Sequence, residues 1–486
     1  MARPDDVYDL VILGAGSTAF AAALRAAELG RRSLMIENRV VGGTCANRGC
    51  LPSKNLMEAA RHLYDARHPR YAAIEPCAPA LDFQALIQQK DALVREYRAR
   101  KYDSVAAGDA QVEIARGTVR FTDTRTVAID SVNGPRLVRG ERFLIATGSR
   151  PRIPAIAGLD AVPYLTSDLL SSDEKMELTA LPESLIVVGG GYIALELGQM
   201  FARFGTAVTL IERGPHVLAR DFEPEVGRMI ETLFAAEGIT VLRNAAVERV
   251  WRDGERGIAV SVAERGGTRE LRAEHLLVAA GRVPATEGIG LQSAGVTLDA
   301  TGAVQVDTTL RTSAPHIWAA GDVIGDQVES QMATPVGAHD GAIAAWNALG
   351  DGPAVEVNHR VIPRAIFTDP QIAMVGMTDR QANAAGRTCW CNTLPLELVP
   401  RAAAIHETRG LVKMVADAET NEVLGVTMVG REAAEIIHEA AMALRFHATI
   451  DDFRDMLHVY PTMAEALKIA AISRYKDPSR LSCCAE

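Results

Sequence analysis

The sequence predicts an α/β fold in which two similar strand–turn–helix units precede an α+β region. Residues 8–14 (YDLVILG) and the stretch that begins at Ser184 (SLIVVGGGYIALELGQMFARFG) are both short apolar runs that end in glycine and continue into a helical pattern. After about His359 the pattern changes, and strand-like runs are followed by helical ones. We therefore expect two Rossmann-like dinucleotide-binding domains and an α+β C-terminal domain, which suits a length of 486 residues.

The composition is that of an ordinary globular protein. There are 51 Lys and Arg residues against 61 Asp and Glu residues, a net charge of −10, and 48% of the residues are hydrophobic. The acidic balance argues against nucleic-acid binding. No apolar run reaches the roughly 18 residues that span a bilayer, and residues 1–6 are too few and too polar for a signal peptide. We expect a cytoplasmic protein without stable membrane association.

The remaining segments complete the predicted domain organisation. Residues 82–107 have the pattern of a long amphipathic helix, and residues 111–142 that of short β segments broken by Gly, Asn and Pro. Residues 475–486 lack periodicity and predict an exposed tail. The expected domains are residues 1–160 completed by a central segment at 275–350, residues 161–274, residues 351–474, and the tail at 475–486.

The first strand–turn–helix unit carries a dinucleotide-binding fingerprint. Gly14, Ala15 and Gly16 follow the strand, and Glu37 ends the next strand about 20 residues later. The glycines allow a pyrophosphate to approach the helix N-terminus, and the carboxylate can bind ribose hydroxyls. A GxGxxA motif alone also occurs at simple tight turns, but the strand, helix and acid around it favour a nucleotide site.

The second unit repeats this fingerprint with conflicting signals for the coenzyme. Gly189 and Gly191 form the turn, and Glu212 stands at the end of the next strand with Arg213 beside it. A carboxylate at this position favours NAD, whereas an arginine can neutralise the 2′-phosphate of NADP. We predict NADPH and leave NADH as the alternative.

Two cysteines lie between these units, just before a helical pattern. Cys45 and Cys50 belong to the stretch GGTCANRGCLPSK at residues 42–54. The positive end of a helix stabilises thiolate, which makes such cysteines good nucleophiles and ligands for soft metals. Half of a zinc site is the alternative, but no second ligand pair with suitable spacing stands nearby. We predict a redox-active pair.

The cysteine motif resembles that of the flavin-dependent pyridine nucleotide–disulfide oxidoreductases. The resemblance covers almost the whole chain, because four further motifs also match: LIATGSRPRIP at 144–154, GGGYIALE at 189–196, VAAGRVP at 278–284 and IWAAGDV at 317–323. It implies an FAD domain, an NAD(P) domain, a central segment and a C-terminal dimerisation domain. It also implies a homodimer whose active sites are shared between subunits.

The resemblance assigns roles to individual residues. It implies that Cys50 is the thiolate next to the flavin and Cys45 the thiol that faces substrate. Lys54, paired with Glu196, is expected near the flavin N5, and Tyr192 is expected to cover the flavin until the nicotinamide displaces it. The implied cofactor-binding residues are Gly14, Ala15, Gly16, Glu37, Gly43, Thr44, Lys54, Val119, Thr147, Gly148, Gly189, Gly191, Glu212, Arg213, Gly281, Arg282, Gly321 and Asp322.

One departure from the family pattern bears on the substrate. Members that reduce disulfides use a His-Pro-Thr-x-x-Glu motif whose histidine protonates the leaving thiolate, whereas this chain has Tyr460 in that position and keeps Glu465. A phenol with a pKa near 10 is a poor proton shuttle at neutral pH. His458 lies two residues upstream, at a position that is also His in some disulfide reductases, and we do not count it as the missing base.

The other departure is a pair of adjacent cysteines, Cys483 and Cys484, near the end of the chain. Neighbouring Cα atoms are only about 3.8 Å apart, so this pair is strained when oxidised and available to soft metals when reduced. Together with Tyr460 it resembles the mercury-reducing branch of the family. We expect NADPH-dependent reduction of thiol-bound Hg(II) to Hg(0), with the tail cysteines passing the metal to Cys45 and Cys50 of the other subunit and Tyr460 helping to position it.

Two other functions stay open at this point. A disulfide reductase of the thioredoxin-reductase type would use Cys483 and Cys484 to carry electrons out, and a non-catalytic relative would only bind metal. Cys77 has no visible partner, and Cys389 and Cys391 have the spacing of two residues on one face of a strand, which favours packing over metal binding.

Overall fold

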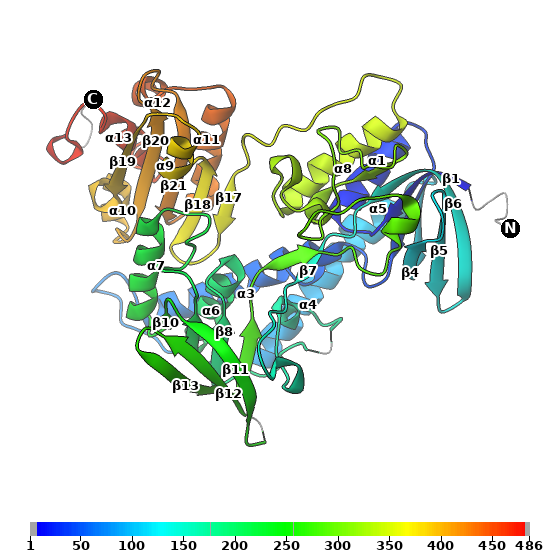
Figure 1. The fold of residues 1–486 in the computed structure, drawn as a ribbon. Coiled ribbons are helices and arrows are strands. Elements are labelled where there is room, and N and C mark those ends of the chain that lie inside the picture. Colours follow the sequence, from blue (N-terminus) through cyan, green and yellow to red (C-terminus); the bar gives the residue numbers. More distant parts are fainter. Residues whose placement is uncertain (1–6, 175, 256, 482–486) are drawn as a thin grey trace.

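The computed structural model describes residues 7–174, 176–255 and 257–481 and confirms the predicted α/β fold class. Three regions are visible in Figure 1: one on the right around β1 and β6, one at the bottom around β8 and β11–β13, and one at the upper left around β18–β21. The long helices α3 and α4 lie between them. No helix within the described ranges is both long enough and apolar enough to cross a membrane.

The first region is built on a seven-stranded sheet in the order β3-β2-β1-β6-β5-β4, with β16 paired to β6. Strand β1 pairs in parallel with β2 and β6, and its residues from Leu10 to Leu13 are fully buried, as the apolar run predicts. The strands are β1 Val7–Leu13, β2 Ser33–Glu37, β3 Val112–Arg116, β4 Thr118–Phe121, β5 Thr126–Ser131, β6 Gly134–Ile145 and β16 Ile317–Ala319.

Helices of this region position the cysteine motif and the glycine turn. Helix α8 packs tightly on α1, since a Cβ at Gly341 would lie only 2.2 Å from the backbone oxygen of Thr18. The predicted helix at 82–107 is interrupted by a π turn, Ala99–Asp103, between α4 and α5. The helices are α1 Ser17–Glu28, α2 Gly43–Asn47, α3 Cys50–Arg67, α4 Phe83–Arg98, α5 Ser104–Ala107 and α8 Thr334–Leu349.

The second region repeats the parallel arrangement on a smaller scale. Its four-stranded sheet has the order β10-β9-β8-β14, and a three-stranded antiparallel sheet, β11-β12-β13, follows it. A short antiparallel pair, β7 with β15, joins segments that flank this region. The elements are β7 Ser149–Pro151, β8 Ser184–Val188, α6 Tyr192–Phe204, β9 Ala207–Ile211, α7 Pro224–Ala236, β10 Thr240–Leu242, β11 Ala246–Asp253, β12 Gly257–Glu264, β13 Gly267–Ala273, β14 His275–Val278 and β15 Arg282–Pro284.

The third region is the expected α+β domain. A long segment runs from α8 to β17 (Figure 1), and the antiparallel sheet has the order β17-β18-β21-β20-β19. The elements are β17 Arg364–Ile366, β18 Gln371–Gly376, α9 Asp379–Ala384, β19 Cys389–Pro395, α10 Pro400–Ala404, β20 Leu411–Asp417, β21 Val423–Gly430, α11 Ala433–Arg445, α12 Ile450–Asp455 and α13 Glu465–Ile472.

The start of the predicted tail is held against this domain. The Asn421 side-chain amide donates to the Tyr475 hydroxyl over 3.2 Å, and Pro478–Arg480 forms a 3-10 turn. Residues 482–486, which include Cys483 and Cys484, lie outside the described residues.

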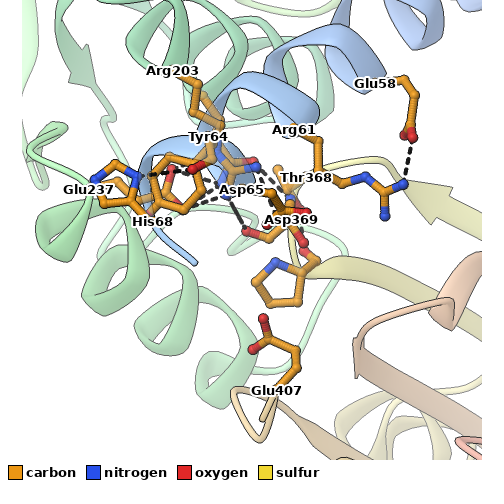
Figure 2. Close-up of polar contacts among 12 residues, drawn as sticks. Glu58, Arg61, Tyr64, Asp65, His68, Arg203, Glu237, Thr368, Asp369 and Glu407 are labelled. Atoms are coloured by element: carbon orange, nitrogen blue, oxygen red, sulfur yellow. Dashed lines mark hydrogen bonds and ion pairs between the residues drawn. The ribbon is translucent and has the colours of Figure 1, made fainter. Parts of the chain in front are cut away.

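A buried polar junction joins all three regions (Figure 2). Arg203 of α6 makes two hydrogen bonds to Glu237, of 2.8 and 2.7 Å, and donates to Asp369 of the C-terminal domain over 2.8 Å. Its guanidinium lies 4.1 Å from the ring centre of Tyr64, which belongs to α3. Arg203 and Glu237 are almost fully buried, so removing either partner would strand a charge. This junction fixes the direction of α3, whose first residue is Cys50.

Candidate active site

The two cysteines of the motif meet at the start of α3. Cys50 is the first residue of this helix, after Gly49, and Cys45 belongs to the separate five-residue helix α2. Both are free thiols. The Thr334 hydroxyl, at the first residue of α8, lies 3.9 Å from the Cys50 sulfur. The site therefore draws on α2, α3 and α8.

The two thiols differ strongly in acidity. A hydrogen bond from Cys45, helped by the positive charge of Lys54, lowers the pKa of Cys50 to about 6. The same hydrogen bond to Cys50, together with burial, raises the pKa of Cys45. At neutral pH Cys50 is therefore a thiolate and Cys45 a thiol. The sequence motif identifies the pair, and this difference makes Cys50 the thiolate, while the positions of the two sulfurs relative to flavin and substrate stay predictions.

Lys54 and Glu196 form the expected ion pair. Lys54 lies one helical turn after Cys50, so both side chains share a face of α3. Its ammonium donates to the two Glu196 carboxylate oxygens over 3.0 and 2.8 Å. The Phe367 backbone N–H donates to the same carboxylate over 2.9 Å, and the Phe367 ring centre lies 4.7 Å from the ammonium. The pair therefore connects α3, α6 and the C-terminal domain.

Tyr192 is the first residue of α6 and is partly buried. Its ring packs edge-on against Phe222 at 5.9 Å, and its hydroxyl lies 3.5 Å from an Arg364 guanidinium nitrogen. Burial raises the pKa of its phenol. The side chain is thus neutral and held between the second region and the C-terminal domain.

The first glycine turn is packed too closely for side chains. A Cβ at Gly14 would lie 2.4 Å from the Ala146 carbonyl oxygen, and a Cβ at Gly43 would lie 2.8 Å from the Gly16 Cα. Gly14 and Gly43 both have positive φ. The Ala15 N–H donates to Glu37 over 3.0 Å, which fixes the acid at the turn.

Three segments far apart in the sequence complete this cradle. Ser149 donates to the Asp322 carboxylate over 2.6 Å and accepts a hydrogen bond of 2.8 Å from the Arg282 Nε. The buried Thr147 hydroxyl has no hydrogen-bond partner within the described part of the chain. An unpaired buried hydroxyl is costly, so it points to a polar group that binds there. The residues fit a flavin nucleotide.

The other implied FAD and nucleotide residues occupy strand ends and turns. Val119 is buried on the edge strand β4. Thr44 lies in α2, between Gly43 and Cys45. Gly148, Gly281 and Gly321 have φ of +70°, +103° and +77°, which only glycine adopts without strain.

The second glycine turn is built like the first but is open. A Cβ at Gly189 would lie 2.4 Å from the Ala279 carbonyl oxygen, whereas a Cβ at Gly191 would meet nothing within 4 Å. The Glu212 carboxylate accepts from the Gly214 N–H over 2.5 Å, and Arg213 is exposed. An incoming phosphate therefore has access to Arg213.

Tyr460 lies on the C-terminal domain, and its side chain is 46% exposed. Glu465 accepts from the Thr462 backbone N–H over 3.0 Å. His458 is buried and bonded to Glu439 over 3.0 Å, which raises its pKa.

Three further large apolar residues of this domain are strongly exposed, and two of them, Leu457 and Val459, lie within three residues of Tyr460 in the sequence. Phe446, Leu457 and Val459 are 72%, 84% and 78% exposed. Large apolar side chains that are exposed in a single chain are often covered in a protein interface. The region is therefore suited to contact with a second subunit.

The remaining cysteines have separate surroundings. Cys389 packs beside the apolar cluster of Ala382, Val415 and Leu424, but Cys391 is exposed, so the packing interpretation is wrong for Cys391. Cys77 is also exposed.

Three residues of the candidate site were not predicted. Thr334, Ser149 and Phe367 contact the site through a hydroxyl or a backbone N–H. Ser149 begins β7 and lies within the motif at 144–154, whereas Thr334 begins α8. Phe367 contacts the ion pair through its backbone N–H and its ring, and no motif marks it in the sequence.

Comparisons with known proteins agree with this geometry. Residues 8–342 match the model of the pyridine nucleotide-disulphide oxidoreductases, and residues 362–471 match that of their dimerisation domain. The chain is 44% identical to a mercuric reductase of Streptomyces lividans over 98% of both chains, and 40% identical to one of Lysinibacillus sphaericus over 99% of this chain and 85% of the relative. A solved Cu(II) complex of the HOCl-induced flavoprotein disulfide reductase RclA from Escherichia coli superposes with a TM-score of 0.84 at 30% identity, covering 96% of this chain and 99% of that one.

Proposed function

This chain belongs to the pyridine nucleotide-disulphide oxidoreductase family and is a flavin-dependent oxidoreductase, and from that premise we propose that it reduces Hg(II) to Hg(0). Its electron source would be NADPH, its resident flavin FAD, and its substrate Hg(II) bound to small thiols. The observation that carries this proposal is the Cys45–Cys50 pair in a chain that has Tyr460 where disulfide-reducing relatives have a histidine. The relatives named mercuric reductase agree with it.

The cysteine pair suits a soft metal that prefers two thiolates. Cys50, already a thiolate at neutral pH, would displace one thiol ligand of Hg(II). Cys45 would then release its proton and displace the second ligand. Once bound, Hg(II) has lost its contact with the small thiols and needs two electrons and no proton to leave as Hg(0).

FAD, when bound, supplies a hydride acceptor and a two-electron donor. Lys54 would hold a positive charge near the reacting centre, and Glu196 would keep its ammonium in place. Tyr192 would cover the flavin and move aside when the nicotinamide enters. None of these steps requires an imidazole, which explains why a tyrosine at position 460 is compatible with the reaction.

The proposal includes a homodimer with shared sites. The exposed apolar side chains of Phe446, Leu457 and Val459 would be covered by the partner, and Tyr460 would then help to position the metal at the cysteine pair of the other subunit. Cys483 and Cys484 would capture Hg(II) and transfer it by thiolate exchange to Cys45 and Cys50.

An anaerobic assay tests the reaction. Purified enzyme is given NADPH and Hg(II) with excess small thiol, and NADPH oxidation and volatile mercury are both measured. One Hg(0) per NADPH is expected. Cys50→Ser should abolish the reaction, whereas Cys391→Ser, which alters an exposed thiol outside the site, should leave it unchanged. NADPH oxidation without mercury release would contradict the proposal.

The tail is tested separately with a bulky thiol as the ligand of Hg(II). The double variant Cys483→Ala/Cys484→Ala should lose most of its turnover with this substrate. Full turnover would show that the tail has no relay role, while the proposed reduction at Cys45 and Cys50 would still stand.

Disulfide reduction is the second candidate, favoured by the likeness to RclA, which is described as a flavoprotein disulfide reductase. It predicts that a small disulfide or thioredoxin supports faster NADPH oxidation than Hg(II) does. The same assay with both substrates distinguishes the two candidates.

A further inference from the structure

A second cluster of ligand-type side chains lies on α8, apart from the cysteine pair and the residues assigned to the flavin. His339 and Asp340 are neighbours on this helix, and His359 belongs to the segment that leads to the C-terminal domain. The nitrogen and oxygen atoms that these side chains could offer to a metal all lie within 4.8 Å of one another.

Both imidazoles face the same carboxylate. The His359 Nε2 lies 2.9 Å and the His339 Nδ1 lies 3.2 Å from the Asp340 Oδ1. Asp340 is fully buried, yet its other oxygen, Oδ2, has no hydrogen-bond partner in the described ranges. A buried carboxylate oxygen without a partner is costly, and a cation beside it would remove that cost.

The backbone prepares His359 to act as a ligand. Its Nδ1 lies 2.9 Å from the Val328 carbonyl oxygen, which can only accept a hydrogen bond, so Nδ1 carries the proton. In the neutral ring, Nε2 therefore presents its lone pair toward Asp340. Metal-binding histidines commonly donate their other N–H to a carbonyl in this way. The His359 side chain is only 3% exposed, so its direction is fixed.

His339 gives the cluster access to solvent. Its side chain is 58% exposed, in contrast to Asp340 and His359. A metal ion can therefore enter on that side, and a water molecule can occupy the remaining position. Two imidazoles and a carboxylate are a donor set that suits Zn(II) and its neighbours among the divalent transition metals.

We propose that His339, Asp340 and His359 bind one divalent transition-metal ion of the Zn(II) class, with water completing the coordination. The ion would connect α8, the turn at Gln327–Glu329 through the Val328 carbonyl, and the segment that enters the C-terminal domain. Val328 and Glu329 have positive φ, of 49° and 60°, so the backbone of this turn is strained. A bound ion would stabilise the turn through the hydrogen bond between His359 and the Val328 carbonyl. Thr334, which touches Cys50, begins the same helix.

Without a metal, the same geometry is explained by a protonated His359 paired with Asp340. That arrangement satisfies Oδ1 but leaves Oδ2 without a partner, and it requires nothing of His339. The contribution of His339 therefore distinguishes a metal site from a buried ion pair.

The test is Zn(II) binding to the FAD-loaded enzyme after its accessible thiols have been alkylated, because free cysteines also bind zinc. Equilibrium dialysis should give one Zn(II) per chain. His339→Ala should weaken binding about tenfold or more. His438→Ala, which removes an exposed histidine on α11, is the matched control and should not change the affinity.

A spectroscopic readout identifies the ligands. Cu(II) added to the alkylated enzyme should show coupling to two imidazole nitrogens in its electron paramagnetic resonance spectrum, and to one nitrogen in His339→Ala. Because His339 is exposed, this variant should keep its flavin and its thermal midpoint, which verifies that it is folded. Absence of saturable binding, or the same affinity in His339→Ala as in the unmodified chain, would overturn the proposal in favour of the ion pair.

Discussion

The two nucleotide units of this protein share a turn but differ in what covers it. In each unit the glycine after the first strand lies against a carbonyl oxygen. A Cβ at Gly14 would lie 2.4 Å from the Ala146 oxygen, and a Cβ at Gly189 would lie 2.4 Å from the Ala279 oxygen. In the first unit α2 closes over the turn, and Gly43 reaches the backbone of Gly16. In the second unit the equivalent glycine, Gly191, is open.

This difference matches two ways of using a nucleotide. An enclosed turn favours a cofactor that stays bound, whereas an open one favours a coenzyme that enters and leaves in each turnover. The acids are held alike in one respect, because each accepts a hydrogen bond from the backbone N–H two residues later, that of Arg39 for Glu37 and that of Gly214 for Glu212. Glu37 also accepts a hydrogen bond from the Ala15 N–H inside the turn, whereas Glu212 is followed by the exposed Arg213.

The largest expected effect comes from filling the enclosed turn. In Gly43→Ala the new Cβ would overlap the Gly16 backbone and the residue would keep a φ of +63°, so we expect flavin binding to weaken about 100-fold. Gly191→Ala should leave flavin binding unchanged and raise only the KM for the nicotinamide coenzyme. Flavin absorbance per chain after dialysis measures the first effect. Equal flavin loss in both variants would remove the distinction between the units.

The fold of these units could be predicted because its signals are local. The apolar run before Gly14 and the helical pattern after it encode a strand and a helix without reference to the rest of the chain. The three-stranded sheet β11–β13 was not predicted, since its alternation is interrupted by charged residues such as those at 252–256. The split of the helix at 82–107 was missed for a related reason, as a π turn carries no distinct residue pattern.

The site was predictable only where chemistry and motif coincide. Cys45, Cys50 and the glycines stand out by residue type, and the family pattern adds Lys54 and Glu196. The acidity difference between the cysteines depends on distances across three helices, and the contact of Phe367 with Glu196 uses a backbone N–H. The cluster around Asp340 combines residues about 20 positions apart whose meeting depends on the path of the chain after α8.

A smaller effect on turnover and stability is expected from changing the Lys54–Glu196 ion pair, which joins α3 to α6. Glu196→Gln keeps the shape of the side chain but leaves the Lys54 ammonium without a charged partner. We expect turnover to fall about tenfold and stability by about 1–3 kcal/mol, because the carboxylate is buried. Steady-state rates and the thermal midpoint measure both. Glu58→Gln is the control. It alters an exposed ion pair on α3, the helix of Lys54, and should change neither turnover nor the thermal midpoint.

The coenzyme preference tests how the second unit, with Glu212 and Arg213, differs from the first unit, with Glu37. Arg213→Ala should raise the KM for NADPH roughly five- to tenfold and leave that for NADH unchanged, since only NADPH carries the 2′-phosphate. Arg228→Ala, another exposed arginine of the second unit, should affect neither coenzyme. A wild-type enzyme that prefers NADH would show that Glu212, despite its bond to Gly214, still binds the ribose.

The smallest expected effect is on the pKa of Cys50, the thiolate at the start of α3. The rate of Cys50 alkylation by iodoacetamide in the reduced enzyme should rise with pH through a midpoint of about 6. Because the pKa is lowered on folding, the thiolate contributes stability above the ordinary thiol pKa of about 8.5, and this contribution is lost as pH falls through about 6.

Lys54 separates the two causes of this low pKa. Lys54→Met removes the nearby positive charge but keeps the hydrogen bond from Cys45, so the midpoint should move up by about one unit and stay below the ordinary value. Lys101→Met, at an exposed position of the same region, should leave it in place. A midpoint near 8.5 in Lys54→Met would assign the whole effect to charge, and the closeness of Cys45 would then have no part in making Cys50 the thiolate.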